Sequence, residues 1–155
     1  MTSQQRYLDD LTAMRAIRTT VRAIILHDDR VLVQRPADEP DSCYGFIGGR
    51  VEFGESLEER LHRELDEEVG ATVASLRYLF FVENRFVHRD GLVHLHEHFF
   101  GVELTRYEIS SREPKLVQSW LPRTQLASFD LRPHVVRDAV AGNQHLALRH
   151  LVVPL

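Results

Sequence analysis

The stretch GRVEFGESLEERLHRELDEEVGA, residues Gly49 to Ala71, is the part of the sequence that decides the fold. Its second half predicts a helix, because apolar residues recur at the spacing of one helix face, at Leu57, Leu61, Leu65 and Val69. Ser56, followed three residues later by Glu59, has the pattern of a capping box. The helix is therefore expected to begin directly after Ser56 and to bury its apolar stripe in a core.

Three acidic residues of this helix, Glu64, Glu67 and Glu68, stand at positions i, i+3 and i+4 and so share one face. Adjacent carboxylates repel one another, and no lysine separates them. Hard divalent cations such as Mg²⁺ and Mn²⁺ prefer carboxylate oxygens, so the cluster predicts a metal site. The helical wheel places Glu68 along the buried edge, with Glu64 beside it and Glu67 further round. The other acids of the helix are interpreted as solvated surface: Glu58, Glu59 and Asp66.

The residues before the helix are rich in glycine. Gly48, Gly49 and Gly54 surround the short extended run Val51–Phe53, which predicts a turn with exposed backbone groups leading into a helix N-terminus. Helix N-termini attract anions. A glycine turn alone is typical of a plain hairpin, but next to an acidic helix face it indicates a phosphate site.

The spacing of these positions resembles the Nudix box of the Nudix hydrolases, whose fixed positions match Gly49, Glu55, Arg63-Glu64-Leu65, Glu67-Glu68 and Gly70. Two positions depart from the usual pattern. Ala71 replaces a larger aliphatic residue, and Ile47 replaces the proline that often precedes the glycine pair. Both departures concern packing and loop stiffness rather than ligands.

The resemblance implies an α/β (α+β) fold, an α/β/α sandwich with a mixed β-sheet between helices. It also implies hydrolysis of a nucleoside diphosphate linked to another group X, with release of a nucleoside monophosphate. Mg²⁺ or Mn²⁺ would be bound by Glu64, Glu67, Glu68 and the Gly49 carbonyl. Attack of water on a pyrophosphate requires charge neutralisation and an activated water, which divalent ions supply.

Two further box residues have expected roles. Arg63 lies four residues before Glu67 and could orient its carboxylate through a charge-assisted hydrogen bond. An ordinary surface ion pair is the alternative for Arg63. Glu55 is expected to support the loop or to bind a second metal.

Length and composition limit the function classes. With 155 residues the chain is interpreted as a single domain, residues 1–155. The net charge of −4, without a basic run, makes nucleic acid an unlikely main partner, although a capped RNA end stays open. Cys43 is the only cysteine, and no stretch has the length of a membrane span. A cytoplasmic enzyme acting on a small nucleotide derivative is expected, and a homodimer is favoured by general frequency alone.

The first half of the chain predicts a helical extension over residues 1–17, covering a sheet edge or a partner subunit. A hairpin is expected next, with Thr19–Leu26 as its first strand, His27–Arg30 as the turn and Val31–Arg35 as its second strand. Residues Pro36–Ser42 form a loop, either a plain connection or a border of the substrate site.

A second hairpin is expected from Thr72–Phe86 and His94–Leu104. Strand alternation places Glu97 on an otherwise apolar face with Val93, Leu95 and Phe99. A carboxylate facing a core is costly unless it is paired or metal-bound. Glu97 is therefore a candidate extra ligand or general base, with a structural hydrogen-bonding acid as the alternative.

Histidines fill the opposite face of the same strand, at positions 94, 96 and 98. Their spacing allows a zinc site, but a half-solvated face, or one that stacks on a substrate base, is the alternative. Tyr44, Phe46, Phe81 and Phe86 could likewise stack on a base or belong to the core.

The C-terminal part predicts a strand over 115–120, a second amphipathic helix over 132–141, and an apolar tail that is either a terminal strand or a dimer contact. Two alternative functions stay open. The chain could be a non-catalytic nucleotide or nucleotide-sugar sensor, or a nucleotide-sugar hydrolase that cleaves the glycosidic bond. Nucleoside triphosphates, nucleotide sugars and ADP-ribose all remain candidates for the substrate.

Overall fold

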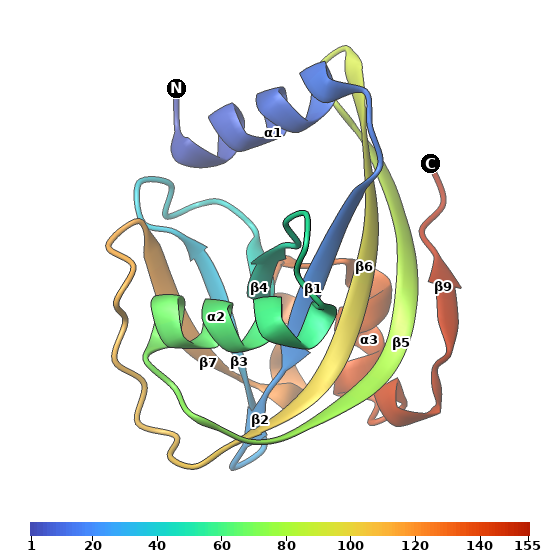
Figure 1. The fold of residues 1–155 in the computed structure, drawn as a ribbon. Helices are drawn as coiled ribbons and strands as arrows, with labels where there is room; N and C mark the ends of the chain where they lie inside the picture. The colour runs from blue at the N-terminus through green and yellow to red at the C-terminus, as the bar shows by residue number, and fades with distance from the viewer.

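Nine β-strands form one mixed sheet at the centre of the computed structural model, which describes residues 1–155 (Figure 1). The main strand order is β2-β3-β4-β1-β6-β5-β9, with β7 paired to β3 and β8 to β4. The elements in chain order are α1 (Ser3–Met14), β1 (Arg18–Ile24), β2 (Leu26–His27), β3 (Arg30–Pro36), β4 (Tyr44–Arg50), α2 (Leu57–Val69), β5 (Val73–His88), β6 (Gly91–Leu104), β7 (Leu116–Pro122), the 3₁₀ helix η1 (Arg123–Ser128), β8 (Leu131–Arg132), α3 (His134–Ala141), the 3₁₀ helix η2 (His145–Ala147) and β9 (His150–Val152).

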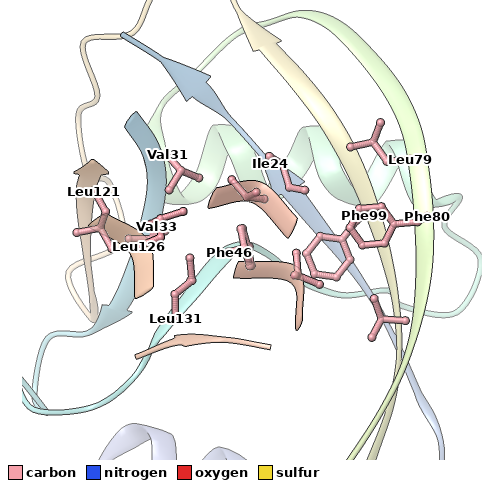
Figure 2. Close-up of a cluster of buried hydrophobic side chains, with 13 residues drawn as sticks. Ile24, Val31, Val33, Phe46, Leu79, Phe80, Phe99, Leu121, Leu126 and Leu131 are labelled. Carbon is pink, nitrogen blue, oxygen red and sulfur yellow. The ribbon is translucent and has the colours of Figure 1, made fainter. Parts of the chain in front are cut away.

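Helices cover the two faces of this sheet and create two hydrophobic cores. Figure 1 shows α2 in front of the sheet and α3 behind it. The core under α2 contains Leu61, Leu65 and Val69 together with side chains from β1 and β6. The core on the other side contains Val136 and Val140 of α3 (Figure 2 shows the side chains of this cluster). The α/β/α sandwich with a mixed sheet is therefore confirmed.

Aromatic side chains fill the middle of the second core. Phe80 and Phe99 are stacked with ring centroids 4.9 Å apart, and Phe46 meets Phe99 edge to face at 5.4 Å (Figure 2). Both arrangements match the quadrupole of aromatic rings. These rings make β4, β5 and β6 a rigid support for the polar residues farther along the same strands.

The ends of helix α2 are set by its sequence. Ser56 accepts a hydrogen bond from the Glu59 amide while the Glu59 side chain accepts one from the Ser56 amide, as the capping-box pattern predicted. Gly70 ends the helix in the left-handed conformation, with φ of 60°. The caps fix where the helix begins and ends, and burial of Leu61, Leu65 and Val69 sets the direction in which its acidic face points.

The first predicted hairpin is only partly correct. The extended run breaks after Ile24, and only Leu26 and His27 pair with Arg30 and Val31 across the turn. Strand β1 instead pairs with β4 on one side and with β6 on the other. Because both of its edges are already used, β1 cannot also pair with β3.

The second hairpin forms as predicted. Strands β5 and β6 are antiparallel over nearly their whole length, with His88 opposite Gly91 at the turn. The C-terminal tail adds the short strand β9, which runs parallel to β5. The tail is therefore a terminal strand of the sheet.

The N-terminal extension forms helix α1, which Figure 1 shows above the open end of the sandwich. It begins at Ser3 and ends before Arg15, whose left-handed φ of 46° terminates it three residues earlier than the predicted 1–17 extension. No helix in the structure is both long and apolar enough to cross a membrane.

Candidate active site

Gly49, near the end of β4, lies directly against the carboxyl group of Glu64 on α2. A Cβ atom at Gly49 would overlap the carboxyl group of Glu64. Gly48 is equally restricted, since its φ is 149° and an added Cβ would overlap the backbone of Val21. The end of β4 is thus packed against the acidic face of α2 at Gly49 and against the backbone of β1 at Gly48, and each glycine makes one of these approaches sterically feasible.

The three acids of the helix face differ in exposure. Glu64 is the most buried, with 4% of its surface exposed, and it forms an ion pair with Arg60 one turn earlier. Glu68 is half-buried, and its Oε2 atom is shielded without any hydrogen-bond partner. The Glu67 side chain is 58% exposed. The wheel placed Glu68 at the buried edge, whereas the fold buries Glu64 more deeply because β4 covers it.

The carboxyl group of Glu68 binds a proton more tightly than an ordinary glutamate does. Burial is the main cause that raises its pKa, and the negative charge of Glu64 adds to it, giving a value of about 8. Gln34 and Arg22 act in the opposite direction but more weakly. The site therefore holds more negative charge than its own side chains neutralise.

This excess charge is suited to a divalent cation, although the side chains do not yet converge on one. No group of three or more His, Cys, Asp or Glu side chains is close enough to hold a metal ion in this arrangement. The donor set consists of hard oxygen atoms, which fits Mg²⁺ or Mn²⁺. The unpartnered Oε2 of Glu68 and the close approach of Gly49 to Glu64 fit such an ion as well.

Arg63 has partners other than the predicted one. Its guanidinium group forms ion pairs with Glu55 and, at 3.3 Å, with Glu52. The distance to Glu67 is 4.0 Å, which is too long for a hydrogen bond. Glu55 also accepts a hydrogen bond from the Glu52 amide at 2.9 Å. In this structure Arg63 and Glu55 hold the loop between β4 and α2 in place.

Glu97 is buried, with 3% exposed, on the face of β6 that strand alternation assigned to it. Its Oε1 atom accepts hydrogen bonds from Arg22 Nε at 3.2 Å and from Thr20 at 3.4 Å. Its Oε2 atom accepts one from Asn84 Nδ2 at 2.9 Å. Donors from two neighbouring strands, β1 and β5, therefore fix this carboxylate in one orientation.

Arg22 and Asn84 were not found from the sequence alone. Burial by itself would lower the pKa of Arg22, but the charge of Glu97 and the hydrogen bond to it raise that pKa above its ordinary value. The sequence did contain a signal for Arg22, which stands in the middle of an apolar strand. A buried arginine needs an anion as its partner. Asn84 gave no comparable signal, because its contact with Glu97 depends on the register of β5.

A cavity of about 800 Å³ connects these groups. Glu68, Glu97 and Arg22 lie on its wall, and so do three members of the predicted aromatic set, Tyr44, Phe46 and Phe86. Glu64 and Glu67 do not reach it. The volume is within the range of small-molecule sites, roughly 300–1,000 Å³. A ligand in this cavity would contact the inner end of the acidic face and the buried Glu97 at once.

The histidines of β6 lie outside this cavity and form no zinc site in the structure. His98 accepts or donates a hydrogen bond with the Tyr78 hydroxyl at 2.9 Å. Phe81 stacks on His98 and on His150, with centroids 5.2 Å and 5.3 Å away. Phe81 is therefore committed to this histidine face of the sheet rather than to the cavity.

Comparison with known proteins identifies the class. The NUDIX domain model matches residues 16–140. The chain therefore belongs to the Nudix family, and it is a Nudix hydrolase.

Individual relatives share only part of the chain. The NAD-capped RNA hydrolase NudC of Mycobacterium tuberculosis is 42% identical over 57 residues, which are 36% of this chain and 18% of that protein. The mitochondrial NAD(P)H pyrophosphatase NUDT13 of Mus musculus is 41% identical over 49 residues, covering 32% of this chain and 14% of that protein. The chain thus spans less than a fifth of the length of these two relatives.

Solved structures support the fold over a longer range. A MutT Nudix hydrolase from Burkholderia pseudomallei has a TM-score of 0.64 at 23% identity, covering 81% of this chain and 97% of that one. A MutT protein from Bacillus halodurans has a TM-score of 0.68 at 20% identity, covering 83% and 85%. At these identities the likeness shows the fold alone.

Proposed function

We propose that this Nudix hydrolase cleaves the pyrophosphate bond of a nucleoside diphosphate linked to a second group, releasing a nucleoside monophosphate. The observation that carries the proposal is the position of Glu68 and Glu97 on the wall of one cavity. Glu68 has an unpartnered oxygen there, and Glu97 is held by three side-chain donors. A bound pyrophosphate would lie between a cation-binding acid and a fixed carboxylate.

Glu64, Glu67, Glu68 and the Gly49 carbonyl would hold Mg²⁺ or Mn²⁺. When bound, the ion neutralises phosphate charge and lowers the pKa of water. The 58% exposed Glu67 side chain is free to turn toward such an ion, because its nearest cation, Arg63, lies 4.0 Å away and is engaged by Glu55.

Side chains of the protein would accept the proton of the attacking water, position the reacting groups and attract the diphosphate. Either a box glutamate or Glu97 accepts the proton of the attacking water. Arg22 and Asn84 keep Glu97 in place, and Arg63 keeps the loop before α2 in place. Arg22 also brings a positive charge to the cavity wall, where it favours the negatively charged diphosphate.

The names of the two relatives suggest what the group linked to the nucleoside diphosphate is. NudC is named for NAD-capped RNA and NUDT13 for NAD(P)H. Both substrates contain an adenine nucleotide joined to another nucleotide through a pyrophosphate. A dinucleotide of this type is therefore the first candidate, ahead of nucleoside triphosphates and nucleotide sugars.

A product-resolved hydrolysis screen tests the proposal. The panel contains NAD, NADH, ADP-ribose, nucleotide sugars, nucleoside triphosphates and coenzyme A, each with Mg²⁺ and Mn²⁺. We expect one class of substrate in this panel to be hydrolysed with release of a nucleoside monophosphate. Release of a nucleoside diphosphate and free sugar would instead support glycosidic cleavage, and binding without any turnover would support a sensor.

Variants on one helix provide the control for this screen. Glu67→Gln and Glu68→Gln should each lower kcat/KM at least about 100-fold, since each removes a ligand that stabilises transition-state charge. Glu58→Gln, on the exposed side of the same helix, should keep wild-type activity. Full activity in both site variants would refute the assignment of the metal ligands.

A further inference from the structure

Helix α1 lies outside the region that the family model matches, which begins at residue 16. It nevertheless forms part of the cavity wall, through Ser3, Gln4, Tyr7 and Leu8. Figure 1 shows the helix crossing the open end of the sandwich, from the loop after β3 to the tip of the β5–β6 hairpin. This wall is therefore an addition of this chain to the matched domain.

Hydrogen bonds hold α1 at its N-terminus and near its middle. At its start, Thr2 Oγ1 donates to Glu39 at 3.0 Å, and Ser3 donates to Asp38 through its amide at 2.9 Å and its hydroxyl at 2.7 Å. Farther along, Asp9 bonds to His88 and Arg89 at the hairpin tip, both at 2.9 Å. The nearest of these partners in the two segments, Glu39 and His88, are 49 residues apart in sequence, so α1 joins remote parts of the chain and has a defined position over the cavity.

Apolar packing fixes the rotation of α1 about its own axis. Leu11 is buried with Val93 and Leu95 of β6, and Leu8 and Phe86 pack against this small core. Gly91 is in such close contact with the helix that an added Cβ would overlap Thr12. One face of α1 is thus held against the β5–β6 hairpin, and another face is held toward the cavity.

Two side chains on the cavity side have unused binding capacity. Tyr7 is 41% exposed although it lines the cavity, and its ring stacks on no other aromatic ring. Gln4 Nε2 donates to Cys43 Sγ at 3.5 Å, while its Oε1 atom is shielded and accepts no hydrogen bond. A flat ring surface and a buried free acceptor therefore lie three residues apart on one helix.

We propose that α1 recognises the nucleobase of the substrate, with Tyr7 stacking on the ring and Gln4 Oε1 accepting from an exocyclic amino group. Nucleobases stack well on aromatic side chains, and glutamine pairs readily with the amino edge of adenine. The inference rests on the proposed function, because it assigns the base-binding part of the same cavity. It predicts a preference for bases with an amino group over hypoxanthine, which has only a carbonyl oxygen there.

Equilibrium binding measured by calorimetry with Mg²⁺ present tests this without requiring turnover. The probes are AMP, IMP and ribose 5-phosphate, which share the phosphate and differ in the base. Stacking on one aromatic side chain is worth roughly 5- to 150-fold in affinity. Wild-type protein should bind AMP at least about 10-fold more tightly than ribose 5-phosphate, and AMP more tightly than IMP.

Variants of α1 separate the two contacts. Tyr7→Ala should reduce the AMP to ribose 5-phosphate affinity ratio about 10-fold, whereas Tyr7→Phe should retain it. Gln4→Met keeps the length of the side chain and should abolish only the preference for AMP over IMP. Met14→Ala is the matched control, because Met14 is an exposed residue of the same helix that does not line the cavity.

Unchanged affinity ratios in Tyr7→Ala, with an unchanged melting temperature, would overturn the proposal. Equal affinity of the wild type for AMP and ribose 5-phosphate would overturn it as well. Failure of the proposed function has a different signature, namely release of a nucleoside diphosphate and free sugar in the screen, or no turnover of any member of the panel, and it leaves the binding ratios of the α1 variants unaffected.

Discussion

The guanidinium group of Arg60 is paired with the carboxylate of Glu64, one helical turn farther along α2. The same guanidinium lies 3.7 Å from Glu52 and 3.9 Å from Glu55. Arg60 thus supplies the counter-charge of Glu64, the most buried acid of the face. A divalent ion bound to Glu64 would take over this role, so ion binding and the Arg60 pair compete for the same oxygen atoms.

Replacing Arg60 with glutamine should therefore destabilise the metal-free protein and increase its response to metal. Loss of a charged hydrogen bond to a buried acid costs on the order of 2 kcal/mol, which corresponds to a fall of roughly 5 °C in Tm. Added Mg²⁺ should raise the Tm of Arg60→Gln by more than that of the wild type. Arg77→Gln, at an exposed arginine without an ion pair, is the control. An equal Mg²⁺ response in all three proteins would contradict the competition.

The contact between Gly49 and Glu64 predicts the effect of a single methyl group. Gly49→Ala should displace the Glu64 carboxylate and lower kcat/KM about 100-fold, as expected for a misplacement of about 1 Å at a reacting centre. Gly142→Ala is a suitable control, because its added Cβ would have no atom closer than 3.4 Å. Steady-state kinetics on the substrate found in the screen, together with thermal denaturation, check this. Wild-type kinetics in Gly49→Ala would show that the Glu64 position is not needed.

Glu97 should act on kcat rather than on binding. Glu97→Gln preserves shape and the hydrogen bond acceptor on one side, so it should fold, and kcat should fall by about 100-fold or more if Glu97 is the base. Asn84→Ala removes the donor to Oε2 and should lower kcat by roughly 10-fold through misorientation of Glu97. Rapid-quench measurement of the chemical step distinguishes this from slow product release. A normal kcat in Glu97→Gln would leave the base role to the box glutamates.

The raised pKa of Glu68 predicts how the stability of the metal-free protein depends on pH. Its carboxyl group titrates near pH 4.5 in the unfolded chain and at about 8 in the folded protein. Between these values the folded state binds the additional proton, so this group makes the protein less stable as pH rises from about 5 to 8. Melting curves in a chelator should show this decline in the wild type and a smaller one in Glu68→Gln. Identical pH profiles for the two proteins would exclude Glu68 as the cause.

Local sequence patterns were sufficient for the elements whose contacts are close in sequence. The period of the α2 stripe, its capping box and the alternation along β6 each depend on neighbours within a few residues, and each was predicted correctly. The same alternation located Glu97 on a buried face. Its role stays a prediction, as do the roles of the box acids.

Contacts between distant segments were harder to predict. The pairing of β1 with β4 and β6 is decided by which strands compete for its edges, and the adjacent sequence suggested β3 instead. Arg22 and Asn84 reach Glu97 only through that pairing and through the register of β5. The place of α1 over the cavity depends on Asp9 and Thr2 finding partners in two remote loops, and no local pattern contains that information.

The Glu97 cluster also constrains how the sheet can assemble. Glu97 is opposite Thr20 of β1 and Val82 of β5, so its donors reach it only in this register. A slip of one residue would turn the carboxylate to the half-buried face that carries His96 and His98, and would leave Arg22 without its carboxylate partner. Misaligned sheets are therefore penalised through the same carboxylate that is proposed to act in the active site. A substitution at Glu97 would therefore affect both the correct alignment of the sheet and catalysis. Substitutions that preserve one of these properties and lose the other should be rare.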